Sequence, residues 1–181
     1  MEFTTAKILA PVVKLKIGVS SCLLGESVRY DGGHKYNQTV IDLFDLGDRF
    51  EAVPVCPEME MGMGVPREPV KIEANRLLGV ESGKDWTEAM HSFHSEKLKE
   101  LTQLNGFIFK SRSPSCGIQG VPVYAETAQA EKSSGLFAHA VMKHFPSLPI
   151  IDEEALQDAT TREKFIARVL GYKGVSGAEK V

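Results

Sequence analysis

The sequence predicts an α/β fold, a single-domain three-layer sandwich built around a mostly parallel sheet. Two observations support this. Short, continuous apolar runs bounded by turn residues recur along the chain, and such runs are typical of parallel strands covered on both faces. Between them lie segments whose apolar residues recur at steps of three and four, the pattern of helices with one buried side. Regular alternation of strand and helix favours a Rossmann-like sheet between two helical layers.

Four buried strands are expected, one from each apolar run. They are residues 15–19, 50–55, 106–109 and 149–151. Two shorter segments, 70–72 and 76–80, follow the second run and are expected to form a small hairpin insertion. The predicted sheet therefore has four central strands, with the hairpin outside it.

Helical patterns separate the strands. Asn37 is a suitable N-cap for a short helix that carries Val40, Ile41 and Phe44 on its inner side. A long helix is expected after the hairpin, because six residues form one stripe along it: Trp86, Met90, Phe93, Lys97, Leu101 and Leu104.

Capping signals mark the starts of the longer helices. Asp85 opens the long helix in a pattern that resembles a capping box, with aspartate in place of serine or threonine. A third helix is expected over residues 134–144, stopped by Pro146, and a fourth over 152–171, opened by Asp152.

The chain of 181 residues fits one compact domain, since it has no internal repeat, low-complexity stretch or clear linker. We expect an α/β domain over residues 15–172, an N-terminal extension at 1–14 and a flexible tail at 173–181. A short apolar piece near the N-terminus is interrupted by Pro11 and lacks the cleavage site of a signal peptide. The expected location is the cytoplasm.

Charge and hydropathy narrow the range of partners. A formal net charge of -3 provides no positive field for a phosphate backbone, so polymeric nucleic acid is not an expected partner. No apolar run approaches the roughly 20 residues that span a bilayer, so no membrane association is expected. A single nucleotide or base is not excluded by the charge argument, and the oligomeric state is left open.

The three cysteines of the chain form neither an even set nor a C-x-x-C pair, so a disulfide scaffold is unsupported. Cys22, Cys56 and Cys116 each come shortly after the carboxyl end of an expected strand. Because these ends share one edge of an open parallel sheet, where ligands bind, we expect the three thiols to meet there. Three independent buried thiols are the alternative.

Three thiolates leave one coordination position open, as a catalytic metal site requires. Sulfur ligands select zinc, copper(I) or an iron–sulfur cluster, and a zinc ion completed by water or a histidine is one alternative. His91 and His94 lie on an expected helix, where histidines are usually solvated, so we do not expect them to bind metal. His34 lies nearer to the cysteines and is a candidate substrate contact.

The loops beside the cysteines carry polar groups suited to a small anionic or heteroaromatic ligand. Residues 111–117 offer hydroxyls, a proline turn and free amides, and Arg29 follows the first cysteine. Glu58 and Glu60 follow the second cysteine, where a buried carboxylate suits acid–base work. Ordinary turns, a solvated Glu60 and an internal ion pair of Arg67 are the plain alternatives.

Five motifs span most of the chain: VSSCLLG at 19–25, VRYDG at 28–32, PVCPE at 54–58, Pro66-Arg67 and KSRSPSCG at 110–117. Together they resemble the DUF523 family, whose characterised members are thiouracil desulfidases. The resemblance extends from about Lys16 to about Phe145.

The resemblance implies a [4Fe–4S] cluster held by the three cysteines, with the fourth iron free to bind the sulfur of the substrate. It also implies a desulfidase that converts 2-thiouracil to uracil, with sulfide leaving by way of the cluster. Glu58 and Ser113 match the catalytic glutamate and serine of the family, with Ser115 as the second choice for the serine. Ser21, Arg29 and Ser115 are the expected substrate-binding residues. One departure is a methionine-rich stretch, residues 59–64, where many members are rich in glycine.

The chemistry is consistent with this resemblance. A thiocarbonyl sulfur is a soft donor that matches a soft iron with an empty position, and binding there polarises the C–S bond. Glu58 can deprotonate water or protonate the leaving carbon fragment, and Ser113 can orient it, with no change of oxidation state. Two other classes stay open. One is a non-enzymatic three-cysteine protein that binds metal, cluster or sulfide, and the other is an interaction module with inert cysteines.

Overall fold

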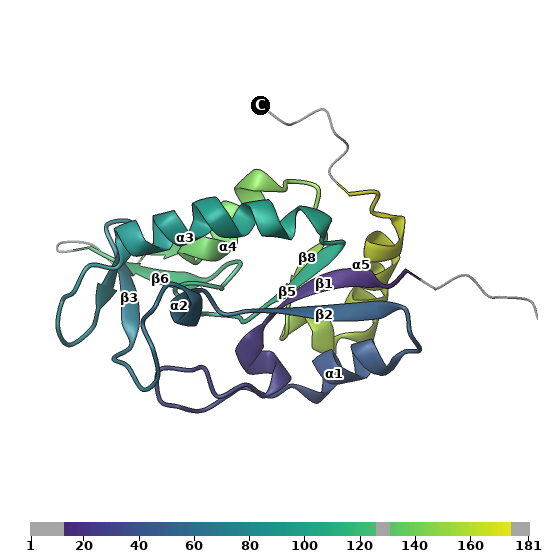
Figure 1. The fold of residues 1–181 in the computed structure, drawn as a ribbon, viewed down its shortest axis with the longest axis horizontal. Coiled ribbons are helices and arrows are strands. Elements are labelled where there is room, and N and C mark those ends of the chain that lie inside the picture. Colours follow the sequence, from purple (N-terminus) through teal and green to yellow (C-terminus); the bar gives the residue numbers. More distant parts are fainter. Residues whose placement is uncertain (1–12, 126–130, 175–181) are drawn as a thin grey trace, which may run out of the picture.

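A computed structural model of the chain describes residues 13–125 and 131–174. Its centre is a parallel sheet of four strands in the order β2-β1-β5-β8 (Figure 1). The strands are β1 (Leu15–Ser20), β2 (Phe50–Val55), β5 (Gly106–Phe109) and β8 (Ile150–Asp152). The predicted α/β fold with a parallel sheet is confirmed. The limits of the expected domain stay a prediction, because most of the extension at 1–14 and of the tail at 173–181 lies outside the described residues.

Helices cover both faces of this sheet. One face carries α1 (Gln38–Asp45) and α5 (Ala159–Gly171), and the other carries α3 (Thr87–Glu100) and α4 (Leu136–His144) (Figure 1). Strand β5 shows the division: Ile108 belongs to the core with α1 and α5, whereas Phe107 and Phe109 belong to the core with α3 and α4. Successive strand residues point to opposite faces, so a fully apolar strand serves two cores.

Close packing at the centre of the sheet depends on a glycine. Gly18 of β1 lies in register with Phe107 of β5. A Cβ atom on Gly18 would lie only 2.4 Å from the ring of Phe107. Phe107 in turn stacks on Phe109, with ring centroids 4.0 Å apart. The missing side chain therefore leaves room for the aromatic stack that α3 and α4 cover.

A second sheet of four strands lies beside the first, in the order β4-β3-β6-β7 (Figure 1). The predicted hairpin is present as β3 (Val70–Glu73) and β4 (Arg76–Gly79), paired antiparallel. The sequence interpretation missed β6 (Val121–Tyr124) and β7 (Glu131–Ser133), which extend the hairpin into a sheet. β6 is short and partly exposed and contains Pro122, so it lacks the signature of a buried strand.

The helix starts agree with the predictions to different degrees. The Asn37 side chain caps α1 by accepting a 3.2 Å hydrogen bond from the Val40 amide, as predicted. The fourth helix was predicted wrongly to begin at Asp152: α5 begins at Ala159 and is capped by Asp158. Asp152 instead accepts from Ala155, at a short turn, η3 (Ala155–Gln157). Extended backbone at Asp158 separates this turn from α5, so two aspartate caps follow each other.

The long helix is shorter than its apolar stripe. α3 covers Thr87–Glu100, so Trp86 precedes it and Leu101 begins a separate turn, η2 (Leu101–Gln103). Asp85 accepts a 2.9 Å hydrogen bond from the Thr87 amide, which places the predicted capping carboxylate at the start of the helix. Among the described residues, no helix has the length and apolar character needed to cross a membrane.

Candidate functional site

The three cysteines line one cavity of about 610 Å³ at the carboxyl ends of the central strands. Cys22 lies in a turn directly after β1, η1 (Ser21–Leu24), and Cys56 lies between β2 and the short helix α2 (Pro57–Glu60). Cys116 lies in the loop after β5. β1 has β2, the next strand of this sheet along the chain, on one side and the later strand β5 on the other. The strand order therefore reverses at β1, and ligands bind at such a reversal in open parallel sheets.

All three cysteines are free thiols, and two of them are buried. Burial, followed by the nearby Cys56, raises the pKa of the Cys22 thiol to about 11, although Arg29 and Lys110 act in the opposite direction. Burial also raises the pKa of Cys56, and it raises the pKa of Cys116 well above its usual value. Thiolates at these positions therefore need a positive partner in the cavity, and a bound metal provides such a charge.

Glu58 lies in the first turn of α2 and is held at both carboxylate oxygens. Oε2 accepts from the guanidinium of Arg67, through Nε at 3.2 Å and through Nη2. Oε1 accepts a 2.8 Å hydrogen bond from the hydroxyl of Ser115. The exposed fraction of the Glu58 side chain is 16%, so a partly buried carboxylate with a fixed orientation faces the cavity.

Arg67 connects Glu58 to two loops. Its side chain is 6% exposed and also donates to the carbonyl oxygens of Gly64, at 2.7 Å, and Val28, at 2.9 Å. The proposed internal ion pair of Arg67 is present, with Glu58 as its partner. The sequence motifs around Val28, Glu58 and Arg67 thus meet at one carboxylate.

The two candidate serines occupy different environments. The Ser113 hydroxyl accepts hydrogen bonds from the amides of Ser115, at 3.2 Å, and Cys116, at 3.1 Å, and Ser113 lines the cavity. Ser115 has no exposed surface and is absent from the cavity lining, because its hydroxyl points to Glu58. Ser113 therefore faces the cavity and shapes the turn before Cys116, while Ser115 supports the carboxylate from behind.

A family model for 2-thiouracil desulfurase matches residues 17–153. The chain belongs to the 2-thiouracil desulfurase family. It is 31% identical over 151 residues to the uncharacterized protein YbbK of Bacillus subtilis (strain 168), a match that covers 77% of this chain and 97% of YbbK. Its structure is similar to that of the [4Fe-4S]-dependent thiouracil desulfidase TudS (DUF523Vcz), with a TM-score of 0.66 and 28% sequence identity. That similarity covers 83% of this chain and 99% of the TudS chain, and the resemblance to the DUF523 family is confirmed.

The other predicted site residues of this 2-thiouracil desulfurase family member are divided between the cavity and its surroundings. Ser21 and Arg29 line the cavity, and the Arg29 guanidinium lies 5.3 Å from the centre of the Tyr30 ring. His34 is not part of the lining, and its Nδ1 accepts from the Tyr36 amide. His34 is therefore engaged locally and does not reach the cavity.

Glu60 is engaged outside the cavity. One oxygen accepts a 3.0 Å hydrogen bond from the Cys56 amide, and the other lies 2.8 Å from Nζ of Lys97 in α3. Its side chain is 34% exposed, about twice the fraction of Glu58, which agrees with the expectation that Glu60 is the more solvated of the two carboxylates. Glu60 thus anchors α2 to α3 and supports the backbone at Cys56.

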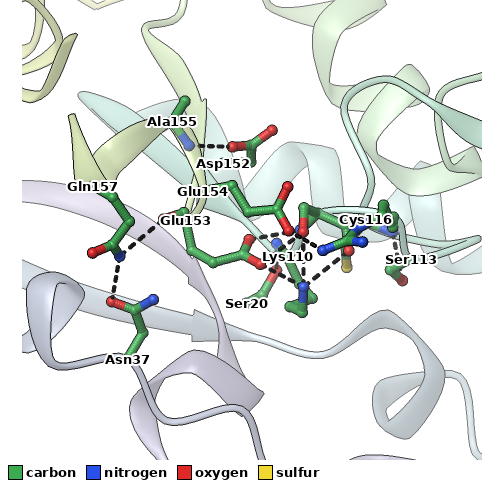
Figure 2. Close-up of polar contacts among 12 residues, drawn as sticks. Ser20, Asn37, Lys110, Ser113, Cys116, Asp152, Glu153, Glu154, Ala155 and Gln157 are labelled. Atoms are coloured by element: carbon green, nitrogen blue, oxygen red, sulfur yellow. Dashed lines mark hydrogen bonds and ion pairs between the residues drawn. The ribbon is translucent and has the colours of Figure 1, made fainter.

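Sequence reasoning missed a polar cluster of Lys110, Ser111 and Glu153 on the wall of the cavity. Figure 2 shows Lys110 and Glu153 of this cluster. Glu153 directly follows β8, the fourth strand of the sheet. The rule that identified the cysteines, which searches beyond the carboxyl ends of parallel strands, could have found Glu153 as well. It was applied only to the strands that a cysteine follows.

Proposed function

We propose that this protein is a [4Fe-4S]-dependent desulfidase that removes sulfur from a small thiolated heterocycle such as 2-thiouracil, giving uracil and sulfide. The observation that carries the proposal is the arrangement of three free thiols, from three different strand ends, around the one cavity that also contains Glu58. Membership of the 2-thiouracil desulfurase family and similarity to TudS support the same reaction class.

The donor set of the cavity fits an iron–sulfur cluster. Within residues 13–125 and 131–174, no three His, Cys, Asp or Glu side chains are grouped to hold a single metal ion. A zinc ion draws its sulfur ligands to about 2.3 Å from one centre. A cubane cluster is larger and binds each cysteine through a different iron, so it suits thiols that are distributed around a cavity. Cys22, Cys56 and Cys116 would hold it, and the chain has no fourth cysteine.

When bound, such a cluster would supply a soft iron with an open position that matches the sulfur of a thiocarbonyl group. The protein supplies the remaining chemistry. Glu58 accepts a proton from water as the water oxygen bonds to the thiocarbonyl carbon, and the C–S bond breaks with its electron pair on sulfur. The sum is thiocarbonyl plus water giving carbonyl plus hydrogen sulfide. No external oxidant or reductant is needed.

The surroundings of Glu58 suit this role. Arg67 and Ser115 fix the two carboxylate oxygens, which removes the cost of orienting the base during the reaction. Ser113 lies at the cavity surface and is positioned to orient the water or the substrate. Ser21 and Arg29 are the proposed substrate contacts on the wall formed by the β1 loop, whereas the burial of Ser115 favours a supporting role. Free thiols also suit a reducing compartment, and we propose the cytoplasm.

The decisive experiment combines cofactor and product analysis. Protein purified without oxygen is assayed for iron and acid-labile sulfide and then incubated with 2-thiouracil. About four of each per chain, together with release of uracil and sulfide, is the expected result. A full cluster with no turnover of any thiolated pyrimidine would favour the non-enzymatic alternative, a cluster- or sulfide-binding protein. A colourless protein that binds zinc instead would overturn the proposal.

A further inference from the structure

The loop that carries Cys116 is held by the first turn of α4. All four amides at residues 135–138 donate to backbone carbonyl oxygens of this loop, over 2.7–3.1 Å: one to Gly117, one to Pro114 and two to Ser115. The first amides of a helix have no partner within it, and a side chain at the N-cap usually accepts from one of them. At α4 the N-cap is Gly135, which has no side chain, so the loop satisfies these amides instead. Helix and loop therefore stabilise each other.

This close contact depends on the missing side chain of Gly135. The residue is buried, and a Cβ atom there would lie 2.6 Å from the carbonyl carbon and oxygen of Ser115 and 2.8 Å from the carbonyl oxygen of Pro114. These neighbours are backbone atoms, so no side-chain rotation relieves the clash. The backbone at Gly135, with φ -65° and ψ 152°, is one that any residue adopts. Glycine is therefore required here for space and not for conformation.

Ser115 is the point at which α4 reaches the proposed base. Its carbonyl oxygen accepts from the amides of Phe137, at 3.0 Å, and Ala138, at 3.1 Å, and its own amide donates to Oγ of Ser113 at 3.2 Å. Its hydroxyl donates to Oε1 of Glu58, and the residue has no exposed surface. Because the backbone of Ser115 is held on both sides, the direction of its Cα–Cβ bond is fixed, and only rotation about that bond is left to the hydroxyl. The N-terminus of α4 thus decides where this hydrogen-bond donor to Glu58 lies.

We propose that Gly135 is a positioning residue for the desulfidase reaction: by letting α4 contact the backbone of Ser115, it aligns the Ser115 hydroxyl with the carboxylate of Glu58. This inference rests on the proposed function, because it concerns the orientation of the same base. The proposed ligand Cys116 depends on α4 less directly, since its amide donates to Oγ of Ser113 at 3.1 Å. Loss of the glycine should therefore affect the rate before it affects the cluster.

The test compares Gly135→Ala with the wild-type holoprotein, both purified without oxygen. We expect kcat for 2-thiouracil to fall roughly 10-fold, and by no more than in Ser115→Ala, because one hydrogen bond to the charged carboxylate is misaligned. KM and iron content should stay close to wild type. Gly171→Ala is the matched control: Gly171, the last residue of α5, has open space where a Cβ atom would lie, so all three quantities should be unchanged.

A double-mutant cycle with Ser115→Ala tests whether the effect passes through the hydroxyl. Once the hydroxyl is absent, misalignment of residue 115 has no hydrogen bond to Glu58 left to disturb. Gly135→Ala combined with Ser115→Ala should therefore turn over within about twofold of Ser115→Ala alone. A residue that only stabilises the fold would lower the rate by the same factor in both backgrounds.

The outcomes separate this inference from the proposed function. Effects that multiply in the double variant, an unchanged kcat in folded Gly135→Ala, or a loss of iron in proportion to the loss of rate would overturn the inference while the desulfidase activity stands. A wild-type holoprotein that releases no uracil overturns the proposed function, and this inference with it.

If Gly135→Ala does not fold, amide hydrogen exchange in the Ser115→Ala holoprotein decides. Coupling free energies are reciprocal, so if α4 favours the hydrogen bond from Ser115 to Glu58, loss of that bond must weaken the contact with α4. The amides of residues 136–138 should then exchange faster than in wild type, measured relative to the Val40 amide of α1, whose acceptor is Asn37. Equal exchange in the two proteins overturns the inference.

Discussion

The hydroxyl of Ser115 and the carboxylate of Glu58, 57 residues apart in sequence, are joined by a 2.8 Å hydrogen bond. The contact connects the loop that carries Cys116 to the helix that follows Cys56. The orientation of the proposed base is therefore coupled to the positions of two of the three proposed cluster ligands.

Replacing Glu58 with glutamine should abolish most turnover of 2-thiouracil and leave the cluster in place. The amide keeps the size of the side chain but does not accept a proton, and the loss of a positioned proton-transfer group costs on the order of 10²–10⁴-fold in rate. Initial rates of uracil release measure the turnover. The absorbance spectrum of the brown protein, recorded on the same sample, measures the cluster content. Glu60→Gln is the matched control and should lose least, since Glu60 contacts Lys97 and the Cys56 amide. Wild-type turnover in Glu58→Gln would show that the base is a different group.

The alanine variants of the two serines should differ in which property they lose, the rate alone or the rate together with bound iron. Ser115→Ala removes one hydrogen bond from Glu58, and a bond to a charged group is worth about 1.5–3 kcal/mol, so the rate should fall roughly 10- to 150-fold with full iron content. Ser113→Ala leaves the amides of Ser115 and Cys116 without their acceptor and should also lower iron retention. Iron assays and rates on the same samples test this. Equal iron loss in both variants would contradict the assignment.

Each of Cys22→Ser, Cys56→Ser and Cys116→Ser should lose activity and most of its iron. Two remaining thiolates do not hold a cubane that already lacks a fourth protein ligand. Iron and sulfide assays after anaerobic purification measure the loss. Circular dichroism should show a folded chain in all three variants, because the two hydrophobic cores are built from the strands and helices. A variant that keeps its full iron content would identify a cysteine that is not a ligand.

His94 should make the fold sensitive to acid. It packs beside Phe137, its Nε2 is buried and has no hydrogen-bond partner among the described residues, and its pKa is lowered to about 4, by burial first and then by His91 and His139. The folded-state pKa lies below the usual value of about 6.5, so the unfolded chain binds a proton first as the pH falls. Stability should decline between pH 6.5 and 4, with a slope of at most about 1.4 kcal/mol per pH unit.

Urea unfolding at pH 7, 6 and 5 measures this decline. His94→Phe should flatten it, because the phenyl ring fits an aromatic environment and carries no titrating group. His91→Gln is the control, since His91 is exposed and its removal changes the charge near His94 without emptying the buried position. Identical pH slopes for wild type and His94→Phe would assign the acid sensitivity to other groups.

The parts of the site that follow from local sequence were predictable. A short apolar run predicts a buried strand, and a cysteine shortly after it predicts a thiol at the ligand-binding edge, so Cys22, Cys56 and Cys116 could be placed before any contact was known. The N-cap of α1 at Asn37 was predictable for the same reason, because the cap and the amide it satisfies lie three residues apart.

The parts that depend on distant contacts were not predictable. Strand β6 pairs with β3 in parallel although the chain between them includes the whole of α3 and β5. β3 carries two charged residues and β6 contains a proline, so neither has the pattern of a buried strand. The choice between Ser113 and Ser115 depends on which hydroxyl faces α2, and serine identity carries no such information. Asp152 and Asp158 are both good caps, so only the intervening backbone decides which one begins α5.

Each of the three cysteines follows a different strand of the central sheet, so the maturation of the protein depends on the order in which its parts assemble. No short peptide of the chain contains two of them, so a nascent or unfolded chain offers no chelating segment of the kind that nucleates a zinc finger. The sheet must assemble before the thiols become neighbours. Delivery of the proposed cluster would therefore be a late event, made to a finished scaffold whose cavity is open to the donor, and we expect a cell that lacks iron to accumulate folded but empty protein.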